Sequence, residues 1–335
     1  MNIEQKRLDN GTIEYTLTNN RGMTVKVINI GCSITEILVP DKTGRFSNVV
    51  LRYDTLGEYF RNEFFLGAVV APVAGRVENA EFEIGDEKYS FAPNEGENLL
   101  HSGNLNLYNK IWESVVEGDK VIFQYKMGDE FPGAPLIKVI YSLNEENELK
   151  LEYEINVDGP SAVAPTNHTY FNLSNESAGD VGGHSVKSTA GHYLKMDEDL
   201  IPGSVEKCDG IFDLKDGRLF KDVFDSDDEQ VRIASDGFDH YFIFDKSDHS
   251  VEVTEEESGR TLNVTTTSPG MVLYTGNSLD DNADLQNRKS GKYLGFCLET
   301  QESPASLKMS IGHDARMNED DVYRRETVYS FGLKK

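Results

Sequence analysis

Short runs in which apolar and polar side chains alternate recur along most of the chain, and this pattern limits the fold more than any other feature. Residues 23–27, Met-Thr-Val-Lys-Val, form one such run, and many runs end at Gly, Asn or Asp. Alternation with a period of two is typical of half-buried strands, whereas apolar residues spaced three and four apart indicate helices. The pattern therefore predicts a chain built mainly from short antiparallel strands.

Four pairs of alternating runs are separated by short polar turns, and each pair is predicted to form a β-hairpin. The pairs join residues 81–84 to 87–91, 112–116 to 120–125, 137–141 to 149–155, and 249–253 to 261–265. Helical periodicity is scarce, and only residues 55–60 and 278–285 are expected to form a turn or two. With no linker or internal repeat, residues 1–335 are expected to fold as a single all-β domain.

The charge balance excludes several classes of partner. The formal net charge is −25 at pH 7, and no cluster of Lys and Arg offers a surface for nucleic acid or for anionic lipid. No stretch approaches 18 consecutive apolar residues, and the first residues have no apolar signal segment, so we expect a cytoplasmic protein. Three widely spaced cysteines, at positions 32, 208 and 297, are expected to be reduced packing residues.

Two segments are expected to be strands with polar and ionisable side chains on one face. In residues 165–173, alternation places Thr166, His168, Tyr170 and Asn172 opposite Asn167, Phe171 and Leu173. In residues 293–301, it places Tyr293, Gly295, Cys297, Glu299 and Gln301 opposite Leu294, Phe296 and Leu298. Small residues leading to Glu299 leave room for a ligand, and the imidazole of His168 titrates near neutrality. The residues alone leave a structural histidine and a solvated glutamate as alternatives.

Three further segments each give only weak evidence of a functional site. They are Gly75-Arg76, His101 before a loop glycine, and Asp239, which is expected to face away from its aromatic neighbours. Together, one Arg, two His, one Asp and one Glu, with Trp112 and many Tyr and Phe, suit a carbohydrate cleft. Aromatic rings cover the apolar C–H face of a sugar, and charged side chains bind its hydroxyls.

The order of these segments resembles the aldose 1-epimerase (galactose mutarotase) family over nearly the whole chain. The matching residues are Gly75-Arg76, Leu100-His101-Ser-Gly103, Thr166-Asn-His168-Thr-Tyr-Phe-Asn-Leu173, Asp239-His240 and Leu298-Glu299-Thr-Gln301. The resemblance implies a large distorted antiparallel β-sandwich with few short helices, no cofactor and no metal. The chain departs from the family at His101-Ser102-Gly103, where His-Gly-Gly is common, and lacks the usual second Arg after Arg76. These departures leave the preferred sugar open.

The resemblance also implies roles for the site residues. Glu299 is expected to act as the base that takes the proton from the C1 hydroxyl of a hexose such as galactose or glucose, and His168 as the acid that protonates the ring oxygen. Arg76, His101 and Asp239 are expected to bind and orient the sugar. The partner is thus a small sugar, with no nucleic acid and no membrane, and the protein is expected to be a monomer or a homodimer.

Three alternatives remain open from the sequence. A hexose-6-phosphate 1-epimerase would use the same fold and chemistry but needs more cations around the phosphate. A sugar-binding module that lost catalysis would not need both Glu299 and His168. A glycoside hydrolase would need a second carboxylate beside Glu299, which 58 acidic residues do not rule out.

Overall fold

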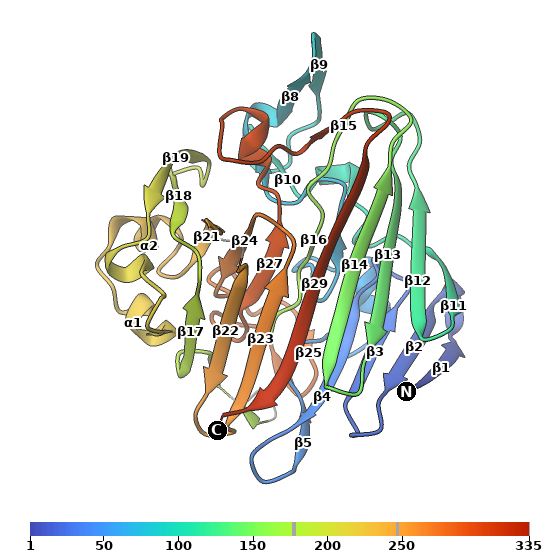
Figure 1. The fold of residues 1–335 in the computed structure, drawn as a ribbon, viewed down its shortest axis with the longest axis vertical. Helices are drawn as coiled ribbons and strands as arrows, with labels where there is room; N and C mark the ends of the chain where they lie inside the picture. The colour runs from blue at the N-terminus through green and yellow to red at the C-terminus, as the bar shows by residue number, and fades with distance from the viewer. Residues whose placement is uncertain (176–178, 246–247, 335) are drawn as a thin grey trace.

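The computed structural model describes residues 1–175, 179–245 and 248–334, and its largest element is a nine-stranded antiparallel sheet (Figure 1). In spatial order its strands are β11 (Glu113–Glu117), β12 (Lys120–Lys126), β13 (Leu136–Leu143), β14 (Glu148–Asn156), β29 (Val322–Leu333), β23 (Arg260–Thr266), β22 (Ser250–Glu255), β17 (His184–Ser188) and β20 (Arg218–Leu219). Three of the four predicted hairpins are neighbouring pairs in this sheet, β11–β12, β13–β14 and β22–β23, and are confirmed.

Two further five-stranded antiparallel sheets complete the main layers of the structure (Figure 1). One consists of β1 (Asn2–Arg7), β2 (Ile13–Thr18), β3 (Thr24–Ile28), β4 (Ile34–Pro40) and β5 (Phe46–Asn48). The other has the order β19 (Pro202–Lys207), β18 (His192–Met196), β21 (Asp239–Ile243), β24 (Gly270–Tyr274) and β27 (Cys297–Gln301). Tyr15 of the first packs on Phe123 of the nine-stranded sheet with ring centroids 5.7 Å apart, and Thr300 of the second hydrogen-bonds Thr327 of β29 at 2.6 Å. The sheets therefore form the layers of a distorted sandwich, as expected.

Short two-stranded ladders complete the strands. They pair β8 (Glu81–Ile84) with β9 (Glu87–Ser90), β7 (Arg76–Val77) with β10 (Leu99–Leu100), β6 (Val69–Val70) with β16 (Thr166–Asn167), β15 (Ser161–Ala162) with β28 (Arg316–Met317), and β25 (Asp284–Leu285) with β26 (Arg288–Lys289). The β8–β9 pair is the fourth predicted hairpin, and it projects from the body of the molecule at the top of Figure 1. The β6–β16 and β7–β10 ladders lead directly into the candidate site residues described below.

Helices are few and short, as expected, but their positions are only partly predicted. The described α-helices are α1 (Phe220–Phe224) and α2 (Glu229–Ile233), and 3₁₀ helices occupy Asp9–Gly11, Leu56–Phe60, Glu78–Ala80, Gly103–Leu105, Gly210–Phe212 and Pro304–Leu307. The turn expected at residues 55–60 is present, whereas the helix expected at 278–285 is wrong. There, the side chain of Asp280 accepts from the backbone N–H of Asn282, an amide that a helix would pair with the carbonyl of Ser278.

Alternation in the sequence becomes alternation in burial. Along β13 and β14 every second side chain is buried in the core between the layers, while its neighbours are half-buried on the outer face. Burying these apolar rows contributes about 25 cal/mol per Å² of apolar surface, which makes the sandwich core the main source of stability. In the described part of the chain, no helix has the length and apolar character needed to span a bilayer.

Candidate active site

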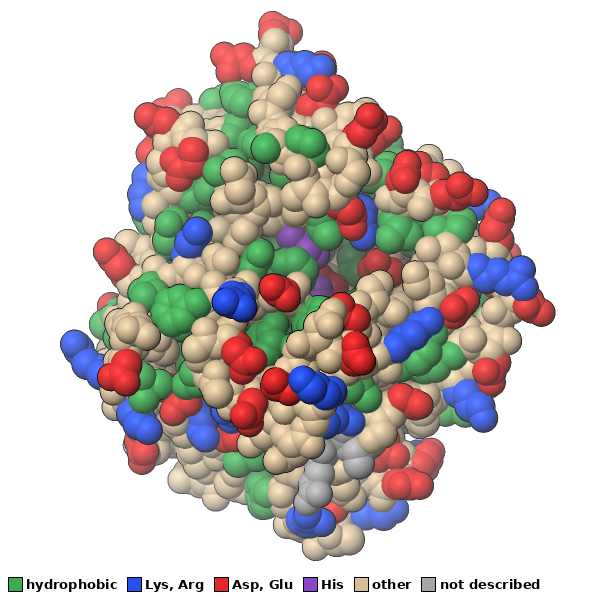
Figure 2. Space-filling model, turned by 180° about the vertical axis from the view of Figure 1, so that it is seen from behind, with side chains coloured by type: hydrophobic (Ala, Val, Ile, Leu, Met, Phe, Trp, Pro, Cys, Tyr) green, Lys and Arg blue, Asp and Glu red, His purple; other side chains and the backbone are tan. Residues whose placement is uncertain are grey.

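All five predicted site residues, Arg76, His101, His168, Asp239 and Glu299, line one cavity of about 330 Å³. This volume falls within the range of small-molecule sites, roughly 300–1,000 Å³. In Figure 2, the face opposite to that of Figure 1, histidine side chains are visible at the bottom of a hollow with acidic and hydrophobic side chains around it. The structure thus brings together residues that lie as far as 223 positions apart, the separation of positions 76 and 299.

His168 follows strand β16, in the segment that the sequence predicts to be one strand from 165 to 173. The strand is shorter than predicted, because only Thr166 and Asn167 pair with β6. The predicted division of faces nevertheless holds for the side chains that matter here. His168 and Tyr170 line the cavity, whereas Phe171 and Leu173 are buried in the core.

Glu299 lies at the centre of β27, whose alternation is also as predicted. Glu299 and Gln301 line the cavity, and Leu298 points into the core. The strand begins at Cys297 rather than at 293, because Tyr293 has a positive φ of 65° and packs its ring on Phe224 instead of facing the cavity. The cavity-facing part of the segment is therefore confined to its C-terminal half.

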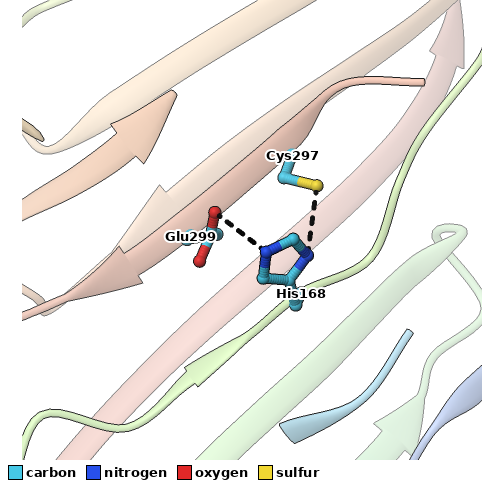
Figure 3. Close-up of side chains that lie close together, drawn as sticks. All are labelled: His168, Cys297 and Glu299. Carbon is cyan, nitrogen blue, oxygen red and sulfur yellow. Dashed lines mark hydrogen bonds and ion pairs between the residues drawn. The ribbon is translucent and has the colours of Figure 1, made fainter. Parts of the chain in front are cut away.

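The two proposed catalytic side chains face each other at the bottom of the cavity. His168 Nε2 lies 3.7 Å from Glu299 Oε1, and the two side chains are 5% and 4% exposed (Figure 3). Burial, with help from the Asp239 carboxylate, raises the pKa of Glu299 well above its usual value, although Arg76 opposes this shift. Burial lowers the pKa of His168 to about 4. Both groups are thus held in an environment that disfavours their charged forms.

Arg76 is held between two carboxylates. Its Nε and Nη2 donate to the two carboxylate oxygens of Glu95 at 2.6 and 2.9 Å, and its Nη1 lies 3.7 Å from Asp239 Oδ2. Burial alone would lower the pKa of Arg76, but Asp239 and Glu95 outweigh it and raise that pKa. Burial raises the pKa of Asp239 against the opposing charge of Arg76. Glu95, in the loop after β9, was not predicted, since nothing in the sequence around it marks a cleft residue.

His101 is fixed by a backbone donor. Its Nδ1 accepts a hydrogen bond from the backbone N–H of Gly75 at 3.0 Å, so the neutral ring carries its proton on Nε2. Burial lowers the pKa of His101 well below its usual value, and the neighbouring His168 and Arg76 add to this shift. Phe65 packs edge-on against His101, with ring centroids 4.7 Å apart, and also contacts His168.

Three residues at this wall of the cavity have a strained backbone. Phe65, His101 and Ser102 all have positive φ, of 58°, 52° and 62°. Side chains with a Cβ rarely adopt this conformation, and it costs of order 1–3 kcal/mol per residue. The Ser102 hydroxyl offsets part of this cost, because it accepts from the backbone N–H of Val73 and donates to its carbonyl.

Asp239 begins β21, and here too the predicted faces are found. Asp239 and Tyr241 line the cavity, whereas Phe238, His240 and Phe242 lie in a buried aromatic cluster on the other side of the sheet. The expectation that Trp112 belongs to the cleft is wrong. Its side chain is 1% exposed in the sandwich core, and its indole N–H donates to the carbonyl of Leu107. The aromatic side chains that line the cavity are Phe64, Phe65, Tyr170, Tyr241 and Tyr274.

All three cysteines are free and buried, as expected, but one of them also contacts the site. Cys297 Sγ lies 3.5 Å from Nδ1 of His168. Within the described residues, His168, Cys297 and Glu299 are the side chains whose donor atoms cluster closely enough to hold a metal ion, all within 4.8 Å of one another. Figure 3 shows the sulfur and the carboxylate facing different ring nitrogens, whereas a metal ion binds an imidazole through one nitrogen, so the arrangement favours hydrogen bonding over metal ligation.

Comparison with known proteins shows the family of the chain. The family profile described as aldose 1-epimerase matches residues 14–330. The galactose mutarotase of Bos taurus is 33% identical over 96% of this chain and 95% of its own, and the aldose 1-epimerase of Escherichia coli (strain K12) is 30% identical over 87% and 86%. Among solved structures, a GalM/aldose epimerase homologue from C. elegans superposes with a TM-score of 0.88 at 26% identity over 97% of this chain and 99% of that one. A galactose 1-epimerase from Lactobacillus acidophilus NCFM gives 0.86 at 27% over 100% and 99%.

Proposed function

The chain belongs to the aldose 1-epimerase family, and from this premise we propose that Glu299 and His168 are the base and the acid that interconvert the α and β anomers of a free hexose. The enzyme is an isomerase of that family. The observation that carries the residue assignment is the pair itself: a buried carboxylate and a buried imidazole, 3.7 Å apart, within one sugar-sized cavity.

The reaction needs two proton transfers and no change in oxidation state. Glu299 takes the proton from the C1 hydroxyl while His168 protonates the ring oxygen, so the C1–O5 bond breaks and the open-chain aldehyde forms. Rotation about C1–C2 presents the other face of the aldehyde. Ring closure then returns each proton with the roles of the two side chains exchanged.

The pair is suited to this exchange because it shares one proton over a broad range of pH. A second proton is taken up only near the pKa of His168, about 4, and the last proton leaves only above the raised pKa of Glu299. The two pKa values belong to the pair rather than to either side chain, and between them the pair holds one proton. The form active in ring opening carries the shared proton on His168 and leaves Glu299 ionised.

The other site residues are assigned to binding. Arg76 donates to sugar hydroxyls from a guanidinium that Glu95 orients, and Asp239 accepts from them. His101 offers an Nε2–H donor, because its Nδ1 is already occupied by the N–H of Gly75. Aromatic rings such as Tyr274 cover the apolar face of the sugar.

The charge of the cavity favours a free sugar over a sugar phosphate. Among the residues that the structure describes, four carboxylate side chains line the cavity, those of Glu63, Glu95, Asp239 and Glu299, against one guanidinium, that of Arg76. That guanidinium is already engaged by two of the carboxylates. A dianionic phosphate would meet these carboxylates and no free cation among the described lining residues, which costs binding energy, whereas a neutral hexose would meet no such penalty.

The remaining expectations from the sequence complete the proposal. We propose that the enzyme works as a single domain in the cytoplasm, without cofactor or metal, and as a monomer or homodimer.

Polarimetry tests the activity and the substrate class together. Freshly dissolved α-galactose and α-glucose should lose optical rotation faster with the protein than without it, and glucose 6-phosphate should show little acceleration. A protein that binds galactose but accelerates neither sugar would be a non-catalytic binding module, and faster reaction of the phosphate would identify the rival epimerase. Release of nitrophenol from a nitrophenyl galactoside would instead indicate hydrolysis.

A further inference from the structure

Gln301 lines the cavity but has no part in the reaction described above. It lies two residues after Glu299 on β27, so both side chains are on the same face of the sheet. It is 1% exposed and borders the same cavity as Glu299. Positions two apart on a strand are separated by roughly 7 Å, so the two side chains can contact different parts of one bound hexose.

The orientation of the Gln301 amide is fixed by the backbone. Its Nε2 donates to the carbonyls of Ala74 and Glu302, at 3.3 and 2.9 Å. Both contacts need a donor, so the amide cannot be turned around, and its remaining polar atom is the acceptor Oε1.

This Oε1 is buried and has no hydrogen-bond partner among the described residues. Of the described side-chain atoms that are buried without a partner, it is the one whose residue lines the cavity. A buried acceptor without a donor costs free energy, and native proteins contain few of them. The unpaired oxygen therefore indicates that a donor comes from whatever occupies the cavity.

Asn277, which is buried outside the cavity, shows the same arrangement in a complete form. Its Nδ2 also donates to two backbone carbonyls, those of Ala234 and Phe238, at 2.7 and 2.8 Å. Its Oδ1 accepts from the hydroxyl of Thr275 at 2.5 Å. Gln301 lacks only this third contact, a hydroxyl donor to the amide oxygen, and a hexose carries several hydroxyls.

We propose that Gln301 is a sugar-binding residue whose Oε1 accepts a hydrogen bond from a hexose hydroxyl other than the one at C1. This inference rests on the proposed function, because it takes a free hexose as the occupant of the cavity. The C1 hydroxyl is assigned to Glu299, so the contact at Gln301 adds recognition of a second position on the sugar.

The contact should determine which sugars bind well. Both N–H groups of the amide are already engaged, so Gln301 can only accept, whereas Arg76 can only donate. A sugar without the matching hydroxyl leaves the buried Oε1 unpaired and is rejected for that reason. The hydrogen bond is present in the bound sugar and during ring opening alike, so its loss should raise KM more than it lowers kcat.

The test combines Gln301→Met, which is close to glutamine in shape, with galactose and its 2-, 3-, 4- and 6-deoxy derivatives. Calorimetry measures the Kd of each sugar, and polarimetry measures kcat and KM. We expect Gln301→Met to bind galactose about tenfold more weakly, with kcat within about twofold. One deoxy sugar should lose about tenfold with the wild type and nothing further with Gln301→Met, because the two changes remove the same hydrogen bond.

Gln230→Met is the matched control, since Gln230 is buried outside the cavity and its amide is paired at both ends with the backbone of Met196. Any loss in this variant should be the same for every sugar. Wild-type affinity of Gln301→Met for galactose would overturn the proposal. An equal further loss for every deoxy sugar would also overturn it, because the amide would then act only by holding Ala74.

A measurement on the wild type covers the case in which Gln301→Met does not fold. Carbon-13 NMR of the glutamine side-chain carbonyls should show one buried resonance that shifts with galactose and not with the matching deoxy sugar. The absence of any such sugar-dependent shift would overturn the proposal. Failure of the proposed function looks different: polarimetry would show no acceleration of any sugar, while calorimetry would still report the contact at Gln301.

Discussion

The nine-stranded sheet and the wall of the cavity are built on different principles. The sheet consists largely of long, regularly paired strands such as β14, with nine residues, and β29, with twelve, whose inner faces are apolar. The cavity wall, by which we mean the segments that carry Arg76, His101, His168, Asp239 and Glu299, is built from short pieces. Three of these residues lie in or next to two-residue strands.

The two regions also differ in what they bury. The sheet buries apolar rows, which stabilises the fold, whereas the cavity wall buries a carboxylate, an imidazole pair and residues with positive φ, all of which cost free energy. The comparison indicates that the sandwich stabilises a site that would not be stable alone. It follows that substitutions in the sheet should change stability, and those in the wall should change activity.

The largest effect is expected from truncation in the sheet. Phe123 of β12 is fully buried between the rings of Tyr15 and Tyr141. Phe123→Ala should lower the free energy of unfolding by about 3–5 kcal/mol, because it removes apolar contacts and leaves a cavity. Urea denaturation measures this loss, and kcat/KM per folded molecule should stay within twofold of wild type. A large loss of activity in the folded fraction would contradict the division between the regions.

A smaller loss is expected at Glu302, which is buried just beyond β27. Unlike Glu299, it is fully paired: Tyr323 donates to it at 2.5 Å and Nε of Arg325 at 2.7 Å. Glu302→Gln leaves a buried phenol and a guanidinium with a weaker, neutral acceptor, so it should cost about 2–3 kcal/mol of stability. Thermal and urea unfolding check this value, and a stability equal to wild type would show that the pairing contributes nothing.

Substitution of Arg76, which is paired with Glu95, should weaken sugar binding. Arg76→Lys replaces a fork that satisfies both oxygens of Glu95 with a single ammonium group. We expect KM for galactose to rise about tenfold, equivalent to roughly 1.4 kcal/mol, with a smaller change in kcat. Arg324→Lys, at an exposed arginine on the sheet, is the matched control. Equal KM values for the two variants would show that Arg76 does not contribute to sugar binding.

The smallest expected effect is a gain in the free energy of unfolding rather than a loss. Because the folded pKa of Glu299 is raised, wild-type stability is highest below the unfolded pKa of about 4.5 and decreases until pH passes the folded value. Glu299→Gln removes this loss, so it should be more stable than wild type by about 1 kcal/mol at pH 7 and equal to it near pH 4. A pH series of unfolding curves tests the sign, and destabilisation at pH 7 would contradict it.

The sequence predicts the sheet better than the site for the same physical reason. Alternation fixes which side of β13 or β14 is buried, so the four hairpins and the faces of β21 and β27 are predicted correctly. Local patterns single out the five site residues, but their roles rest on the family resemblance, since no local pattern brings Arg76 next to Asp239. Glu95 and Phe65 went unpredicted because long-range packing places them, and Trp112 was misplaced because a large aromatic residue suits a core as well as a cleft.

The claim that Glu299 and His168 act as one unit is tested most directly by a double-mutant cycle on α-galactose, followed by polarimetry. Glu299→Gln and His168→Gln should each lower kcat by roughly 10²–10⁴-fold, and the double variant should be no more than a few-fold slower than the slower single variant, because one shared proton transfer is already lost. If either single variant keeps kcat near the wild-type value, or if the two losses multiply, the pair is not the acid and base of the reaction.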